Sequence, residues 1–396
     1  MGVFAAALRG ETKPAVLRRG SIIALISFLT LIDLFGSQAL LPRLVDAYGV
    51  DPGTMGFAVN ASTFGMAIAG LFVAWFADRI DRRRGIWVSL ALLSIPTFLL
   101  GITQDVTMFG ILRVLQGMCM ATAFTLTLTY LSEQCDITAA SMAMAAYITG
   151  NVGSNLFGRL MAVSFADGFG IAGSFFAFAA LNLLGAIIAM LVIGVKSKEP
   201  PSRGGSPLDA WKGHMAVPSL RASFGLGFII LFAFVGVFTY VNFELVGPTL
   251  DLHPDYLGVV YFVFLPALFT TPLASPIAKA FGPRKVFWLS CLVSIIGLAL
   301  TLVPNLAAVL AGLALIGMGL FFAQAAATAF VGRAATSNHA AANGLYLTSY
   351  YIGGLVGAFA LGQIYDGLAW EGVVAVILAS LVVAMLLAVK MKQAET

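Results

Sequence analysis

The sequence predicts an all-α polytopic membrane protein made of two bundles of six helices. Three observations lead to this fold class. Of the 396 residues, 60% are hydrophobic and only 10% are charged, whereas a soluble protein is about 25% charged. The apolar residues gather into runs close to the roughly 20 residues that a helix needs to cross a bilayer. The pattern then repeats after about 200 residues, which indicates two similar halves.

The apolar runs are too long and continuous for the alternating strands of a membrane barrel, so each is predicted to be a helix. The first run follows a basic segment and is longer than the core of a signal peptide, so we expect it to remain as the first helix. The spans are expected near residues 21–44, 55–77, 86–103, 107–131, 139–164, 171–194, 222–248, 256–278, 286–303, 305–330, 341–364 and 370–389.

The internal repeat defines the predicted domains. Gly117–Met118 in the fourth span recurs as Gly317–Met318 in the tenth, and Gly153 in the fifth recurs as Gly353 in the eleventh. We expect six-helix bundles at residues 1–195 and 222–396, joined by a Pro- and Gly-rich cytoplasmic linker at 196–221. Because six is even, the halves are parallel repeats with a pseudo-twofold axis along the membrane normal. A substrate site is then expected between them, near mid-membrane.

The basic residues predict the orientation. Of the 22 Lys and Arg residues, 19 fall on the side that holds both termini, which indicates that the termini are cytoplasmic. The net charge of +4 therefore reflects topology and is no sign of nucleic-acid binding. We expect a monomer in the bacterial cytoplasmic (inner) membrane, with the lipid bilayer as its surroundings.

The loop after the second span carries a motif. It resembles the signature between helices 2 and 3 of the major facilitator superfamily, Gly-x-Leu-Ala-Asp-Arg-x-Gly-Arg-Arg. The matching residues are Ala77, Asp78, Arg79, Arg82 and Arg83, and the departures are Ala74, Phe76 and Asp81. The resemblance covers essentially the whole chain and implies the major facilitator fold.

Two further segments bear on the branch of the family. In the fourth span, Arg113, Gln116 and Gly117 are similar to the Arg-x-x-Gln-Gly signature of proton-coupled drug exporters. The fifth span lacks the proline of the drug-antiporter pattern Gly-x-x-x-Gly-Pro-x-x-Gly-Gly and has Arg159 instead of a closing glycine. Small residues still recur at every fourth position there, so a close helix contact is expected. The resemblance implies a drug:proton antiporter-like member, with the direction of transport left open.

Three charged residues remain well inside the predicted spans, namely Asp33, Arg113 and Arg159. A charge at mid-bilayer costs about 2.5 to 3.5 kcal/mol on insertion scales, so each needs a partner or a wet cavity. At 1.5 Å per residue, Asp33 lies roughly 18 Å into the first helix and Arg113 about 9 Å from the outer face. In the major facilitator fold, which the sequence resembles, helices 1 and 4 line the central cavity and helix 5 flanks them. We therefore expect a cluster of the three charges.

Asp33 is the predicted proton-coupling carboxylate, because a buried carboxyl close to an arginine is poised to load and release a proton. The alternative is a packing aspartate satisfied by a hydroxyl or an arginine. Arg113 is expected to take part in coupling or gating, against a purely structural counterion. Arg159 has the same two interpretations, and it could instead attract an anionic substrate.

A cytoplasmic gate is expected at Asp78, Arg79, Arg82 and Arg83. Asp78 can accept hydrogen bonds at a helix N-terminus or pair with an arginine, and these bonds would break when the inside opens. The alternative for the basic run is positive-inside charge that faces lipid headgroups.

Other polar groups within the spans are candidates for the substrate cavity, although interhelical hydrogen bonding explains each of them equally well. They are Gln38, Asn60, Asn151, Asn155, Tyr240, Asn242, Glu244, Gln324, Tyr346 and Tyr350.

These patterns predict a secondary active transporter that works by alternating access, with a small molecule and protons as its partners. The leading hypothesis is proton-coupled efflux of small hydrophobic or amphipathic compounds. The alternative is proton-coupled uptake or exchange of a small organic anion or sugar, and a flippase or solute sensor on the same fold is a further possibility. An enzyme is not expected, since the spans hold no Ser–His pair and no second aspartate, and ATP-driven pumping would need a phosphate-binding loop that the sequence lacks. No cofactor and no metal are expected.

Overall fold

The computed structural model describes residues 13–50, 52–76, 80–134, 137–193, 207–252 and 257–391. Helices make up most of this part. They are α1 (Lys13–Ala39), α2 (Leu41–Tyr48), α3 (Pro52–Phe76), α4 (Arg82–Leu100), α5 (Val106–Gln134), α6 (Ile137–Val192), α7 (Pro207–Ala216), α8 (Pro218–Val246), α9 (Leu257–Val260), α10 (Leu265–Thr270), α11 (Ala274–Phe281), α12 (Pro283–Leu300), α13 (Leu306–Ala334) and α14 (His339–Ala388), with the 3₁₀ turns η3 (Tyr261–Phe264) and η4 (Thr271–Leu273).

The twelve predicted crossings correspond to the apolar helices. Within the described residues, eleven helical stretches are long and apolar enough to cross a membrane. One of them, Ala143–Val192, has 50 residues and breaks at Gly170, so it supplies two crossings. The protein is therefore a multi-pass membrane protein, as the sequence predicted.

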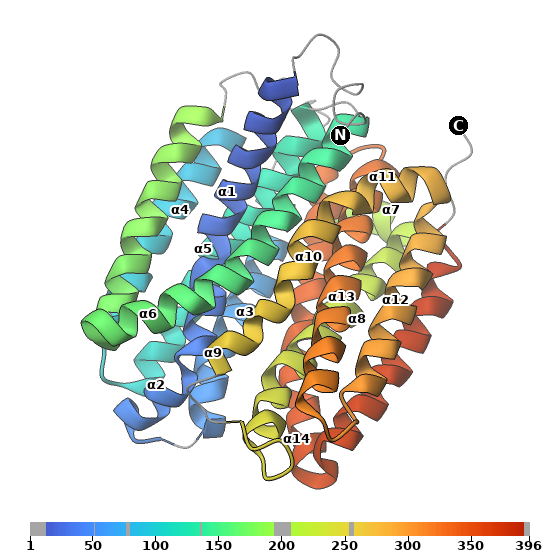
Figure 1. Ribbon diagram of the computed structural model, residues 1–396. Coiled ribbons are helices and arrows are strands. Elements are labelled where there is room, and N and C mark those ends of the chain that lie inside the picture. The colour runs from blue at the N-terminus through green and yellow to red at the C-terminus, as the bar shows by residue number, and fades with distance from the viewer. Residues whose placement is uncertain are drawn as a thin grey trace.

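The helices form two bundles side by side (Figure 1). In the first, α1 packs on α6 and α3 on α5, and α4 packs against α5 and α6. In the second, α8 packs on α14 and α12 on α13. The bundles meet where α3 packs on α14, and where α6 packs along α9–α11 and α13. The start of α1 and the end of α14 lie at one end of the bundle, called the terminus end here, and the opposite end is called the far end.

Two predicted spans are less regular than expected. The first was predicted to run to residue 44, but α1 ends at Ala39 and the short helix α2 follows. The eighth, predicted at 256–278, is divided by the turns η3 and η4. Pro266 and Pro272 lie at these breaks, and proline both lacks an N–H donor and clashes with the preceding turn. The division lets this segment follow the surface of α6.

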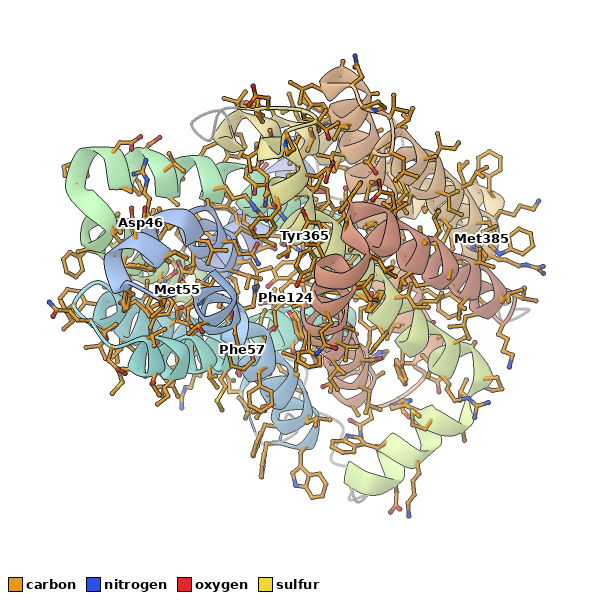
Figure 2. The ribbon with its side chains drawn as sticks, turned by 90° about the horizontal axis from the view of Figure 1, so that it is seen from below. Asp46, Met55, Phe57, Phe124, Tyr365 and Met385 are labelled. Carbon is orange, nitrogen blue, oxygen red and sulfur yellow. The ribbon has the colours of Figure 1, made fainter. Side chains whose placement is uncertain are left out.

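The outer surface of the bundle is apolar, as a lipid-exposed surface requires. Large hydrophobic side chains project outward at several levels, for example Phe57, which is 72% exposed, and Phe269, which is 70% exposed. In the view from the far end, Phe57 lies on the first bundle and Met385 on the second, whereas Phe124, which is buried, lies in the interior between them (Figure 2). The polar groups are instead buried among the helices, where they form the candidate site.

The turns that join the last two crossings of each bundle are related by the repeat but differ in residue type. Gly170 has φ 73° and ψ 173°, and Ala369 has φ 53° and ψ −156°. A side chain in such a conformation costs about 1 to 3 kcal/mol. We expect Ala369→Gly to raise the thermal unfolding midpoint in detergent and Gly170→Ala to lower it. Gly168→Ala is the control, since no other atom lies within 4 Å of the added Cβ. A lower midpoint in Ala369→Gly, or a higher one in Gly170→Ala, would contradict this account of the turns.

Candidate functional site

Asp33 lies on α1, is 1% exposed and is surrounded by side chains from two other helices. Its Oδ2 accepts a hydrogen bond from Thr97 Oγ1 on α4 at 3.1 Å and from Asn182 Nδ2 on α6 at 2.8 Å. Asn182 Nδ2 also lies 3.0 Å from Thr97 Oγ1. The other carboxylate oxygen, Oδ1, is buried without a hydrogen-bond partner among the described residues. One face of this carboxyl is therefore fixed, and the other is available to a proton.

Arg113 on α5 is fully buried beside Asp33. Its Nε donates to the carbonyl of Val59 at 2.9 Å, and its Nη2 donates to Ser62 Oγ at 3.0 Å, both on α3. Its Nη1 donates to Gln116 Oε1 at 2.7 Å and, more weakly, to the main-chain carbonyl of Asp33 at 3.4 Å. The guanidinium thus reaches the backbone of Asp33 and not its carboxylate.

Gln116 connects the arginine to the carboxyl. Its Nε2 donates to Thr97 Oγ1 at 2.7 Å, and Thr97 in turn bonds Asp33. A continuous buried network therefore runs from Arg113 through Gln116 and Thr97 to Asp33 and Asn182. Because each bond is buried, a change of charge at one member alters the interactions of the others.

Arg159 on α6 belongs to a separate network, so the expected cluster of three charges is divided in two. Its Nε donates to Asn155 Oδ1 at 3.0 Å and its Nη2 to Gln38 Oε1 at 2.8 Å. Its guanidinium carbon lies 4.1 Å from the centre of the Tyr261 ring and 5.9 Å from that of Phe35. Both distances suit a cation–π contact.

Tyr261 belongs to η3 in the second bundle, so the Arg159 contact crosses between the bundles. The Tyr261 hydroxyl donates to Asn242 Oδ1 on α8 at 3.2 Å. On the other side, Gln38 Nε2 donates to Asn60 Oδ1 on α3 at 3.2 Å. Four of the predicted cavity residues, Gln38, Asn60, Asn155 and Asn242, therefore gather around Arg159.

The other predicted cavity residues are more scattered. The Tyr240 hydroxyl donates to the carbonyl of Ala358, a contact that holds α8 to α14. Glu244 is partly exposed and interacts with the like charge of Glu371 at the far end. The remaining candidates are all buried, and they are Asn151, Gln324, Tyr346 and Tyr350.

The predicted gate is described only in part, because Asp78 and Arg79 lie outside the described residues. Arg82 is buried and donates to the carbonyl of Ile80 at 3.1 Å. Arg83 donates to the carbonyl of Met190 at 2.6 Å, in the last turn of α6. The Asp81 carboxylate accepts a hydrogen bond from the N–H of Arg84 at 2.7 Å and so caps α4. The contacts of Arg83 and Asp81 therefore join parts of the first bundle to each other and do not reach the second bundle.

The two bundles also touch on the terminus side. Thr348 Oγ1 on α14 donates to the carbonyl of Ala67 on α3 at 3.4 Å. Trp211 on α7 meets Trp75 on α3 edge to face, with ring centres 5.6 Å apart. His214 on the same helix contacts the carbonyl of Asn338 at 3.3 Å, and burial lowers the pKa of its imidazole. The helix α7, within the predicted linker, thus contacts both bundles.

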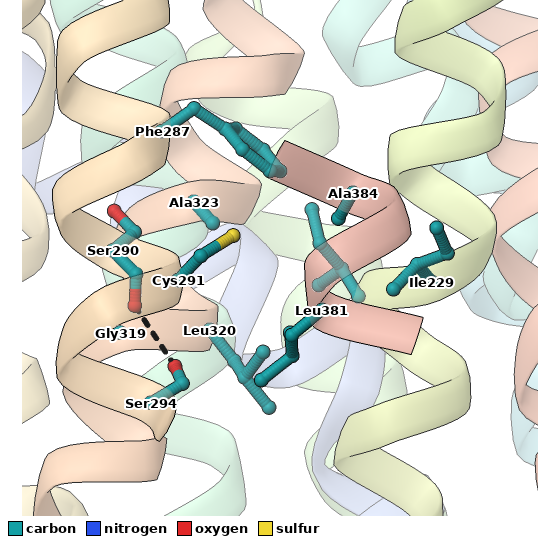
Figure 3. A pocket seen from close by; sticks show the side chains of 11 residues that line it. Ile229, Phe287, Ser290, Cys291, Ser294, Gly319, Leu320, Ala323, Leu381 and Ala384 are labelled. Atoms are coloured by element: carbon teal, nitrogen blue, oxygen red, sulfur yellow. Dashed lines mark hydrogen bonds between the residues drawn. The ribbon is translucent and has the colours of Figure 1, made fainter. Parts of the chain in front are cut away.

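A small cavity lies away from these networks, among α8, α12, α13 and α14 (Figure 3). Its volume is about 10 Å³, which is room for about one water molecule. Its walls are mainly apolar, with Ser290, Cys291 and Ser294 on one side. The cavity is too small for a substrate and lies inside one bundle, so it is not the candidate site.

Several residues of the networks were not singled out from the sequence. Thr97, Asn182 and Ser62 are single polar residues in apolar helices, and Tyr261 is one of ten tyrosines. A signal for Asn182 does exist, since an amide in the middle of an apolar span needs a partner as Asp33 does. For Tyr261 the sequence carries no such signal, because its role arises from contact with the other bundle.

Two six-helix bundles, with one buried polar network inside the first bundle and a second at their boundary, form the architecture of a membrane transporter. The family model of the Major Facilitator Superfamily matches residues 23–250 and 245–395. The chain therefore belongs to the Major Facilitator Superfamily and is a secondary transporter, not an enzyme.

Similar proteins support the same assignment. The inner membrane transport protein YnfM of Escherichia coli (strain K12) is 27% identical over 366 residues, which cover 90% of this chain and 86% of YnfM. The MFS-type transporter YybF of Bacillus subtilis (strain 168) is 25% identical over 366 residues, covering 90% of this chain and 89% of YybF. The crystal structure of the human organic anion transporter MFSD10 (TETRAN) superposes with a TM-score of 0.75 at 14% identity, over 94% of this chain and 98% of MFSD10. The last similarity shows the fold alone.

Proposed function

We propose that this secondary transporter is proton-coupled and that Asp33 carries the transported proton. The observation that carries the proposal is the buried carboxyl whose Oδ2 is held by Thr97 and Asn182, while Oδ1 has no hydrogen-bond partner in the described chain. The free-energy cost of ionising such a carboxyl depends on its surroundings, and the charge of Arg113 lies close enough to change that cost. Protonation would leave Arg113 as the one charge of this network.

The position of Asp33 supports a link between the proton and the substrate. Gln38 follows Asp33 by five residues on α1, a rise of about 7.5 Å, and it accepts a hydrogen bond from Arg159. Arg159 in turn contacts Tyr261 in the second bundle. A movement of α1 on protonation would therefore change the contact between the bundles, which alternating access requires.

We propose that the transported substrates are small hydrophobic or amphipathic compounds and that they are exported, which the Arg113–Gln116–Gly117 motif supports. The second candidate is proton-coupled uptake or exchange of a small organic anion. Arg159 favours this second candidate, since its partners among the described residues are amide oxygens and aromatic rings, with no acidic group. We also propose that the protein acts as a monomer in the bacterial inner membrane with its termini in the cytoplasm, as the distribution of basic residues supports.

Transport by the purified protein in proteoliposomes tests the proposal. We would impose a pH gradient and offer cationic dyes, sugars and organic anions. At least one class is expected to move against its own gradient, and a protonophore is expected to stop that movement. If a compound exchanges across the membrane and its flux does not depend on the pH gradient, the proposal of proton coupling is wrong.

A further inference from the structure

One face of α6 carries a row of polar side chains that ends at Arg159. Tyr147, Asn151, Asn155 and Arg159 follow each other at four-residue spacing, so they lie on one slowly winding face of the helix. Each is at most 4% exposed. At 1.5 Å per residue the row is about 18 Å long. It has a cation at one end and neutral groups along the rest.

The described residues leave part of this row without hydrogen-bond partners. Tyr147 Oη, Asn151 Oδ1 and Asn155 Nδ2 are buried and have no hydrogen-bond partner within the described segments. The hydroxyls of Ser27, Thr30 and Thr127 lie close enough to Tyr147 to interact with it, so the two amides are the less satisfied members of the row. Buried polar groups are nearly always paired, and each unpaired one needs an explanation. Such groups in a row on one helix, a donor at Asn155 Nδ2 and an acceptor at Asn151 Oδ1, indicate a surface that exchanges hydrogen bonds with a bound molecule.

The row lies at the boundary between the two bundles. At its far side Arg159 contacts Tyr261 of η3. At its terminus side Tyr147 is close enough to Tyr351 of α14 to interact electrostatically. The row therefore lies where the bundles would separate when the transporter opens, so a substrate could reach it from either side in turn.

The charge of Arg159 determines what this surface attracts. Its hydrogen bonds go to two neutral amide oxygens, and the carboxyl of Asp33 is held in the other network. The described residues supply no acidic partner, and a buried arginine in that situation favours an anion. A carboxylate can take two parallel bonds from the guanidinium. The rings of Tyr261 and Phe35 beside it offer an apolar wall.

We propose that this row on α6 is the substrate-binding surface and that the substrate is a small organic carboxylate with an aromatic body. The carboxylate binds Arg159, the ring packs beside Tyr261 and Phe35, and a hydroxyl or similar group bonds Asn155 or Asn151. These amides lie one and two turns from Arg159, or about 6 and 12 Å along the helix. The inference names the substrate class for the second proposed candidate, transport of a small organic anion, and rests on that candidate.

Binding measurements with purified protein in detergent test this inference. The probes are 4-hydroxybenzoate and the longer 4-hydroxycinnamate, each compared with its uncharged primary amide by calorimetric titration. We expect at least one of the two carboxylates to bind and its amide to bind about 10- to 100-fold more weakly, as the loss of a charge-assisted contact implies. Equal binding of acid and amide, or no binding of either acid, would overturn the proposal.

Two variants locate the binding site. Arg159→Gln removes the cation, and Asn155→Asp keeps the acceptor for Arg159 but supplies a carboxylate from within the chain. Both variants are expected to weaken the binding of the carboxylate by about 10- to 100-fold. Because Asn155→Asp adds an ion pair, its unfolding midpoint should equal or exceed that of the wild type, so its loss of binding cannot be attributed to misfolding.

The control is Asn305→Asp, which makes the same chemical change at the cap of α13, where the side chain accepts from the N–H of Ala308. Its carboxylate binding should equal that of the wild type. Wild-type affinity in Asn155→Asp would contradict the proposal. The proposed function fails separately: carboxylates that bind in this way but show no response to a pH gradient in proteoliposomes would disprove proton coupling and leave the binding surface intact.

Discussion

Asp33→Asn is expected to abolish proton-driven accumulation and to leave substrate exchange in place. The asparagine has nearly the same volume, and its oxygen can still accept from Thr97 and Asn182. It cannot gain or lose a proton in the relevant range, so the transport cycle loses its proton. A gradient of one pH unit can support about tenfold accumulation for each coupled proton. In proteoliposomes we expect this accumulation to disappear in the variant.

The control is Asp46→Asn, which removes an exposed carboxylate on α2. Its accumulation should match that of the wild type. Counterflow, in which labelled substrate exchanges with unlabelled substrate and no gradient is needed, shows whether the Asp33 variant still folds and binds. An Asp33→Asn protein that accumulates substrate like the wild type would show that the proton is carried elsewhere.

Gly117→Ala is expected to destabilise the first bundle and to disturb the Arg113 network. A Cβ at position 117 would lie 1.9 Å from the carbonyl oxygen of Ser62, so α3 and α5 would have to move apart. Overpacking of this kind costs about 1 to 3 kcal/mol or more. The same movement would carry Ser62 away from Arg113, which it bonds at 3.0 Å. We expect a lower unfolding midpoint in detergent together with reduced transport.

Gly110→Ala is the matched control on the same helix. Its Cβ would meet Ala58 of α3 at 3.9 Å, an ordinary contact. Alanine is also the better helix former by about 0.5 to 1 kcal/mol. The unfolding midpoint of this variant should therefore stay the same or rise. If both alanines lower the midpoint equally, close packing at Gly117 is not the cause.

The spans could be predicted because each apolar run must be long enough to cross a bilayer, and the structure places helices at these positions. The repeat and the Asp78–Arg79 motif predicted membership of the Major Facilitator Superfamily, and the match to the family model confirms it. The eighth span was predicted at its place, but its division by η3 and η4 was not, although Pro266 and Pro272 lie at the breaks.

The candidate site could be predicted less completely. Scarcity of charge within the spans drew attention to Asp33, Arg113 and Arg159, but it does not say which side chains they meet. Thr97 and Asn182 reach Asp33 because α4 and α6 are oriented about their own axes so that these side chains face α1. The sequence of a span that is apolar on all sides does not indicate which face of the helix points inward. The division of the expected charge cluster into two networks follows from the same packing.

In the proposed transport cycle, a proton moves through Asp33 as substrate crosses the membrane. Proteoliposomes that contain a pH-sensitive dye test it most directly. With a substrate gradient and no initial pH gradient, the wild type is expected to change the internal pH as substrate moves, whereas Asp33→Asn should exchange substrate without any pH change. An Asp33→Asn protein that shifts the internal pH as the wild type does would contradict the claim.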